Sequence, residues 1–128
     1  MTSGTILIVD DNPSNMKLLL FLLSGAGYDV RAAQDADEAL LILRDFSAQM
    51  ILMDLQLPGM DGLELTRKLR ADPTYRDTII VAVTASAMLG DDERALRAGC
   101  DGYVTKPIDT RALPKLVAEY LSRYPRGG

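Results

Sequence analysis

The chain has 128 residues, the size of a single domain, and we expect one domain over residues 1–128 with its core in about residues 4–124. Its net charge of −4 argues against nucleic acid as a direct partner, because binding a phosphate backbone requires a positive surface. The chain has no histidine, which excludes catalytic triads that use an imidazole and any histidine-ligated metal site.

Cysteine content and hydropathy indicate a reducing compartment. Cys100 is the only cysteine, so no internal disulfide can form. No basic-then-apolar leader opens the chain, and the longest aliphatic or aromatic run, Leu18 to Leu23, is far too short to span a bilayer. We therefore expect a cytoplasmic protein that does not insert into a membrane.

Apolar runs typical of strands alternate with helical patterns along the whole chain. Five runs predict buried strands, at residues 5–9, 28–33, 50–53, 79–84 and 103–105. The helical patterns cover about residues 13–26, 35–46 and 63–71, then a segment ending near 98, and 110–124. Asn12 before Pro13 is a helix start, and Pro114 is tolerable only because it lies near the start of the last helix. This alternation predicts an α/β fold, a doubly wound sheet of parallel strands joined by right-handed crossovers.

Chemically reactive side chains stand where four of the predicted strands end. Asp10 and Asp11 close the first apolar run and Asp54 closes the third, while Thr84 and Lys106 end the fourth and fifth. The carboxyl ends of parallel strands meet at one edge of the sheet, which is where open α/β sheets bind ligands. We therefore expect these five side chains to converge on one site.

Three gathered carboxylates require protons or a cation. Two unit charges about 4 Å apart repel by about 4 kcal/mol at an effective dielectric of about 20, so three pairs cost on the order of 10 kcal/mol, comparable to the stability of a domain. Oxygen ligands without imidazole or thiolate select Mg²⁺ or Mn²⁺. One carboxylate can then attack phosphorus and form an aspartyl phosphate, but charge and spacing leave open which carboxylate is the nucleophile.

Each of these residues has an ordinary explanation when it is taken alone. Asp10 and Asp11 fit a solvated loop that leads into a helix, Thr84 fits a β-branched strand residue, and Lys106 fits a surface lysine. Their combination indicates a functional site, because all of these residues stand at the ends of strands in one alternating pattern.

Four segments together resemble the receiver domains of two-component response regulators: ILIVDDNPSN, ILMDLQLPGMDGLEL, VAVTASAM and AGCDGYVTKPI. The last two are similar to single-domain phosphorelay regulators and to receivers attached to hybrid histidine kinases. The resemblance covers essentially the full length. It agrees with a flavodoxin-like sheet of five strands in the order 2-1-3-4-5 with five helices.

The resemblance implies a role for each site residue. Asp54 matches the phosphoacceptor, and Asp10 and Asp11 match the acidic pair that organises Mg²⁺, with Asp11 as the expected direct ligand. The main-chain carbonyl of Gln56 matches a third protein ligand. The remaining matches are the switch hydroxyl Thr84, the phosphate-binding Lys106, the rotamer-switching Tyr103, a cis bond between Lys106 and Pro107, and two residues that tune dephosphorylation, Gln56 and Ser86.

The resemblance also implies partners. A histidine kinase or a histidine phosphotransfer protein is the expected donor, and the surface of the fourth helix, fifth strand and fifth helix is expected to be recognised by an unknown target. In the first helix, MKLLLFLL is apolar nearly all round. If Leu18 and Leu22 face the sheet, then Met16, Leu20 and Phe21 point outward. We expect these three to form a patch that docks the donor or a second copy, in a monomer or weak homodimer. The alternative is that another segment covers them, or that they are singly exposed apolar residues without a role.

Two other functional classes compete with a signalling switch that catalyses only its own phosphorylation and dephosphorylation. A Mg²⁺-dependent phosphatase would place an acid two residues after its nucleophile, where this chain has Gln56. A phosphorylation-independent adaptor or antitoxin-like module would need none of the phosphoryl chemistry. Met1 stands shortly before the first predicted strand, which favours a stand-alone regulator over a receiver excised from a longer protein.

Overall fold

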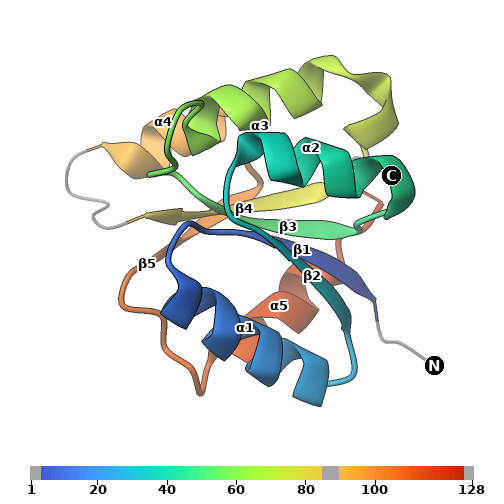
Figure 1. Ribbon diagram of the computed structural model, residues 1–128, viewed down its shortest axis with the longest axis vertical. Helices are drawn as coiled ribbons and strands as arrows, with labels where there is room; N and C mark the ends of the chain where they lie inside the picture. Colours follow the sequence, from blue (N-terminus) through green and yellow to red (C-terminus); the bar gives the residue numbers. More distant parts are fainter. Residues whose placement is uncertain (1–3, 85–89, 126–128) are drawn as a thin grey trace.

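The computed structural model describes residues 4–84 and 90–125 (Figure 1). Its five strands are all parallel, as the alternating pattern predicted, and they pair in the order β2-β1-β3-β4-β5, which agrees with the resemblance. The strands are β1 (Thr5–Val9), β2 (Asp29–Ala33), β3 (Met50–Asp54), β4 (Ile79–Thr84) and β5 (Gly102–Thr105). The α-helices of the described part are α1 (Pro13–Gly25), α2 (Ala36–Asp45), α3 (Gly62–Ala71), α4 (Asp91–Ala98) and α5 (Leu113–Leu121). A short 3₁₀ turn, η1 (Pro73–Tyr75), was not predicted.

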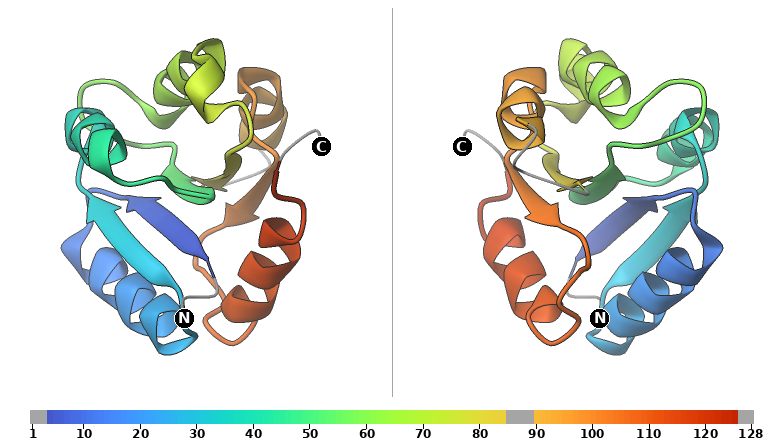
Figure 2. Two further views of the ribbon diagram at one scale, coloured as in Figure 1. Left: turned by 90° about the vertical axis from the view of Figure 1, so that its right-hand side faces the viewer. Right: turned by 90° about the vertical axis from the view of Figure 1, so that its left-hand side faces the viewer.

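The sheet is covered on both faces by helices. Helices α1 and α5 cover one face, and α2, α3 and α4 cover the other (Figures 1 and 2). Neighbouring strand residues alternate between two cores: Leu7 and Ile51 pack under α2 and α3, whereas Ile6 and Leu52 pack under α1 and α5. Because both faces of each central strand are buried, the strands are continuous apolar runs in the sequence.

The last helix begins later than predicted, at Leu113 instead of residue 110. Pro114 has no backbone N–H and therefore belongs in the first turn, where no such donor is needed. A helix that started at residue 110 would have placed Pro114 where it must donate to a carbonyl one turn back. Asp109 accepts from the backbone N–H groups of Arg111 and Ala112 and orders the connection before the helix.

The beginning of α1 agrees with the sequence, but the predicted orientation of the helix was wrong. The side chain of Asn12 caps the helix by accepting from the backbone N–H groups of Ser14 and Asn15. Leu19 and Leu23 are the residues buried against the sheet, whereas Leu18 is 45% exposed. Leucines at nearly every position gave no clear periodicity, so only contact with the core selected the buried pair.

The expected outward patch on α1 is correct for only one of its three residues. Phe21 is 77% exposed, but Leu20 is partly buried and packs against the core, together with Leu22. Met16 is half-buried. The apolar residues that α1 presents to solvent are therefore Leu18 and Phe21.

Across residues 4–84 and 90–125, no helix combines the length and the apolar character needed to cross a membrane.

Candidate functional site

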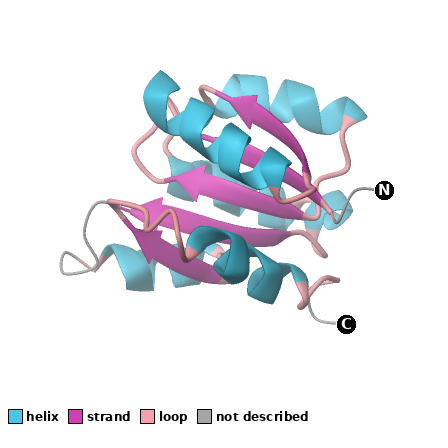
Figure 3. Ribbon diagram, turned by 90° about the horizontal axis from the view of Figure 1, so that it is seen from below, coloured by secondary structure: helices cyan, strands magenta, loops and turns pink. Residues whose placement is uncertain are grey.

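The carboxyl edge of the sheet gathers the residues that the sequence singled out. All strands run in the same direction and end at this edge (Figure 3). Asp54 is the last residue of β3 and Thr84 the last residue of β4, and Asp10 directly follows β1. These three polar side chains are almost fully buried, with exposed fractions of 2% for Asp54, 2% for Thr84 and 3% for Asp10. The parallel register, which places Met53 beside Val9 and Ala82, brings them together.

Three carboxylates form a compact acidic cluster. One carboxylate oxygen from each of Asp10, Asp11 and Asp54 lies within 4.8 Å of the others. Asp10 and Asp54 are buried, and Asp11 is exposed at the opening. The N–H of Asn12 donates to Asp10 Oδ1 at 2.8 Å, and the N–H of Gln56 donates to Asp54 Oδ1 at 2.9 Å. Two local turns therefore hold the buried carboxylates in place.

The electrostatic surroundings of Asp10 are unfavourable to its charge. Burial raises the pKa of the Asp10 carboxyl above its ordinary value of 3.8, and the charges of Asp54 and Asp11 raise it further. The N–H of Asn12 and the ammonium of Lys106 act in the opposite direction but are outweighed. The cluster therefore carries an electrostatic strain that a bound cation would relieve.

Lys106 closes the site from the β5 side. Its Nζ donates to Asp54 Oδ2 at 3.1 Å, and its side chain is 26% exposed, so the ammonium can also contact a ligand. The backbone N–H of Lys106 donates to the carbonyl of Thr84 at 2.8 Å, which joins the ends of β4 and β5. The peptide bond between Lys106 and Pro107 is cis, as expected.

Gly62 is a site residue whose importance the sequence did not reveal. A Cβ at this position would collide with the backbone carbonyl oxygen of Asp54 and would lie 2.8 Å from Cα of Leu55. The N–H of Gly62 also donates to the carbonyl of Leu55 at 3.2 Å. Glycine thus lets the start of α3 pack directly against the strand end that carries Asp54. The available signal was the second glycine of the sequence LPGMDG, which stands directly before the predicted helix.

The donor set fits a small, hard divalent cation. Opposite ligands of an octahedral Mg²⁺ lie about 4 Å apart, so three oxygens within 4.8 Å need only small adjustments to share one ion. The candidate ligands are carboxylate oxygens, and the chain has no histidine that would favour zinc.

The other predicted site residues lie around this cluster. Gln56 is exposed next to Asp54, and the role of its carbonyl as a ligand stays a prediction. Tyr103 lies on the edge strand β5 and is 39% exposed. Ser86 lies outside the described residues.

Comparison with known proteins agrees with this site. Residues 6–118 match the family model of the response regulator receiver domain. The polar-differentiation response regulator DivK of Brucella anthropi is 40% identical over 91% of this chain and 95% of that relative. The chemotaxis response regulator CheY4 of Vibrio cholerae has 28% sequence identity and a TM-score of 0.87, over 93% of this chain and 99% of that chain.

One similar structure contains the metal in question. The receiver domain of the sensor histidine kinase PA1611 of Pseudomonas aeruginosa, with magnesium coordinated in its active-site cleft, has 34% sequence identity and a TM-score of 0.84. The similarity covers 93% of this chain and 98% of that one. With a family match over residues 6–118, the chain belongs to the response regulator receiver domains, phosphoacceptors of two-component systems that signal through conformational change.

Proposed function

We propose that Asp54 is the residue that accepts the phosphoryl group from a histidine kinase or a histidine phosphotransfer protein. The observation that carries this proposal is the ion pair between Asp54 Oδ2 and Lys106 Nζ at 3.1 Å, beside two further carboxylates. A phosphoryl group on Asp54 would be within reach of the Lys106 ammonium, which would stabilise its oxygens.

The two other carboxylates are less suited to nucleophilic attack. Asp10 is buried with a raised pKa, and no ion pair joins it to Lys106 in the described structure. Asp11 is exposed at the opening of the cluster. Both are better suited to hold a cation together with Asp54 and the predicted carbonyl ligand of Gln56. We propose Mg²⁺ for this position, with Mn²⁺ as an alternative of the same ligand preference.

The transfer is a balanced displacement at phosphorus. An oxygen of Asp54 forms the new bond to phosphorus while the bond from phosphorus to the donor imidazole breaks, and its electron pair stays on that nitrogen. When bound, the cation neutralises the carboxylates and the phosphoryl oxygens. Lys106 balances further charge on these oxygens, and the Asp54 side chain is held for attack by the N–H of Gln56.

The conformational signal is proposed to begin at Thr84. Thr84 is at the buried end of β4, where it pairs with Thr105 at the end of β5. Tyr103 lies two residues earlier on β5, opposite Ala82. A phosphoryl group would attract the Thr84 hydroxyl, and Tyr103 would then move inward. This movement would change the surface of α4, β5 and α5 that a target recognises. We infer that the switch operates in the cytoplasm.

Labelling by acetyl phosphate tests this function directly. We expect incorporation of one phosphoryl group per chain in the presence of Mg²⁺, and loss of labelling when the cation is removed with EDTA. Phosphate-affinity electrophoresis or intact mass after an acid quench measures the product. A protein that is never labelled but still binds a partner would instead be a phosphorylation-independent adaptor.

The chain is proposed to promote only its own phosphorylation and dephosphorylation. A phosphatase acting on other molecules would need an acid to protonate the leaving group, and the exposed Gln56 beside Asp54 has an amide that cannot do so. Turnover of many phosphate esters per chain would support the enzyme instead.

The exposed Phe21 supports a docking role for α1. We expect Phe21→Ser to slow phosphotransfer from a phosphohistidine donor by about tenfold, because a partner would lose an exposed aromatic anchor. Labelling by acetyl phosphate, which needs no docking, should be unchanged. Leu41→Ser on α2, where Leu41 is 57% exposed, is the matched control. Equal transfer rates in the Phe21 variant and the wild type would show that the donor docks elsewhere.

A further inference from the structure

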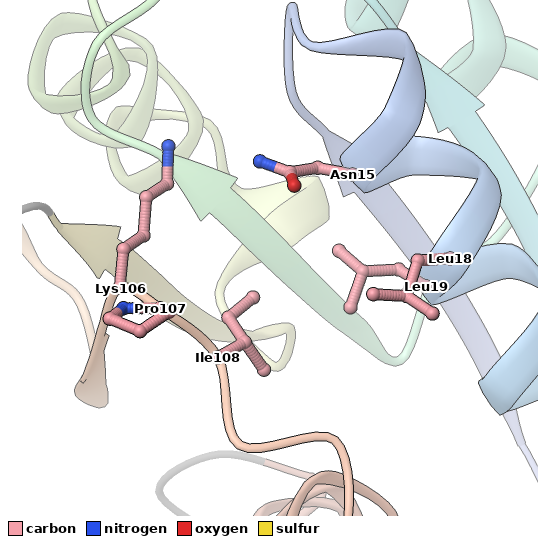
Figure 4. A pocket seen from close by; sticks show the side chains of 6 residues that line it. All are labelled: Asn15, Leu18, Leu19, Lys106, Pro107 and Ile108. Atoms are coloured by element: carbon pink, nitrogen blue, oxygen red, sulfur yellow. The ribbon is translucent and has the colours of Figure 1, made fainter.

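A cleft of about 410 Å³ opens between α1 and the segment that follows β5 (Figure 4). It is lined by Asn15, Leu18, Leu19, Lys106, Pro107 and Ile108. The side chains of Leu18, Leu19 and Ile108 surround its apolar part, and the Asn15 amide and the Lys106 ammonium lie at its polar end (Figure 4). The cleft therefore suits a molecule with an apolar tail and an oxygen-rich head.

The cleft is continuous with the proposed phosphorylation site through one side chain. Lys106 lines the cleft, and its Nζ is also 3.1 Å from Asp54 Oδ2. A phosphoryl group that contacts this ammonium therefore lies at the polar end of the cleft. In an in-line displacement the leaving group lies on the side of phosphorus opposite Asp54. The cleft that shares Lys106 offers this group an apolar wall next to the site.

We propose that this cleft binds the apolar part of a small phosphodonor's leaving group, and that it makes the domain selective for acyl phosphates with longer aliphatic chains. This inference rests on the proposed role of Asp54. The carbonyl oxygen of the acyl group can accept from the Asn15 amide or from Lys106, and the chain can pack against Leu18, Leu19 and Ile108. The positive charge of Lys106 matches the negative phosphoryl group to which the chain is attached.

The transfer from such a donor needs no additional reactant. An oxygen of Asp54 bonds to phosphorus, and the bond from phosphorus to the acyl oxygen breaks with its electron pair. The products are the aspartyl phosphate and a free carboxylate, so charge is conserved and no proton moves.

A series of donors of increasing length measures the contribution of the cleft. Acetyl, propionyl and butyryl phosphate release carboxylates of almost the same basicity, so their intrinsic reactivity is nearly equal. Each fully buried methylene group corresponds to roughly a fourfold gain in the second-order rate constant, hence about fifteenfold from acetyl to butyryl phosphate. We expect the rate constants of the wild-type protein to rise along this series.

A substitution at the wall of the cleft tests whether the aliphatic chain of the donor binds there. Leu18→Gln should lower the ratio of butyryl to acetyl rate constants toward one, because a polar wall no longer favours an aliphatic chain. Leu18 is 45% exposed, so this change leaves the core intact. Leu41→Gln, at an exposed leucine of α2, is the matched control and should keep the wild-type ratio. The donor series on the wild type needs no variant and remains decisive if Leu18→Gln does not fold.

The possible results separate this inference from the proposed function. If acetyl phosphate labels Asp54 but the rate constants do not depend on chain length, the proposed selectivity is disproved. The assignment of Asp54 as the acceptor is not affected by this result. If the wild-type rate constants rise with chain length but Leu18→Gln keeps the wild-type ratio, the aliphatic chain does not bind in this cleft, and the proposal is wrong about the site. If no acyl phosphate labels the protein, the proposed function itself is wrong.

Discussion

Asp54→Asn is expected to reduce labelling by acetyl phosphate, and by a phosphohistidine donor, to the background level. An amide oxygen does not form a stable bond to phosphorus as a carboxylate does, so the acceptor is lost while the shape of the site is kept. The amide oxygen can still accept from the N–H of Gln56, which holds Asp54 in the native structure. Intact mass after an acid quench measures the label.

Asp61→Asn is the matched control for this substitution. Asp61 caps α3 by accepting from the N–H of Glu64 at 2.9 Å, and asparagine is an equally good cap. The control loses the same charge from the loop near the site and should be labelled like the wild type. Persistent stoichiometric labelling of Asp54→Asn would overturn the assignment of the acceptor.

Asp10→Asn is expected to stabilise the protein when no divalent cation is present, by about 1–2 kcal/mol in the free energy of unfolding. The Asp10 carboxylate is buried and has a raised pKa, so its charge opposes folding. Asparagine removes this charge and keeps an oxygen that accepts from the N–H of Asn12. Urea denaturation in EDTA measures the difference.

The sign of the pH dependence follows from the raised pKa of Asp10. As pH rises from the ordinary aspartate value of 3.8 through the higher pKa in the folded state, the unfolded chain releases its proton first. The wild-type protein therefore loses stability as the pH rises through this range. The advantage of Asp10→Asn should accordingly be small in acid and should grow as the pH rises through this range.

In the presence of Mg²⁺, the wild-type protein should be more stable than Asp10→Asn. A cation that binds only the folded state stabilises it by about 2.7 kcal/mol at a hundred times its Kd, and the variant lacks one of the proposed ligands. Asp29→Asn is the control, because the Asp29 side chain is 40% exposed and, among residues 4–84 and 90–125, forms an ion pair only with the exposed Arg31. An Asp10→Asn protein that is destabilised in EDTA, or that gains as much from Mg²⁺ as the wild type, would contradict the proposed role of Asp10.

Local sequence patterns were sufficient to predict most element boundaries. β1 and β4 were predicted with their observed limits, and the Asn12 cap began α1 as predicted. The start of α2 is equally local: Asp35 accepts from the N–H of Glu38, and Glu38 Oε1 accepts from the N–H of Gln34. These features depend on neighbouring residues, so the sequence contains them directly.

The site was predictable to the extent that it depends on strand ends. Parallel strands bring their carboxyl ends to one edge, so the convergence of Asp10, Asp54 and Thr84 followed from the alternation of strands and helices. The sequence also placed Asp11 and Lys106 at this edge, but individual side-chain contacts were not predictable in this way. Lys106 pairs with Asp54 across 52 positions of sequence, and Gly62 is required by the carbonyl of Asp54.

The sequence by itself determined the class of fold, the position of the acidic edge and the chemistry available there, because periodicity and residue type are local properties. Only the tertiary structure decided which leucines of α1 are buried, which carboxylate receives the Lys106 ammonium, and that a cleft adjoins it. The physical reason is that a helix with leucine on nearly every side can pack in several orientations. The shape of the surface it meets selects one of them.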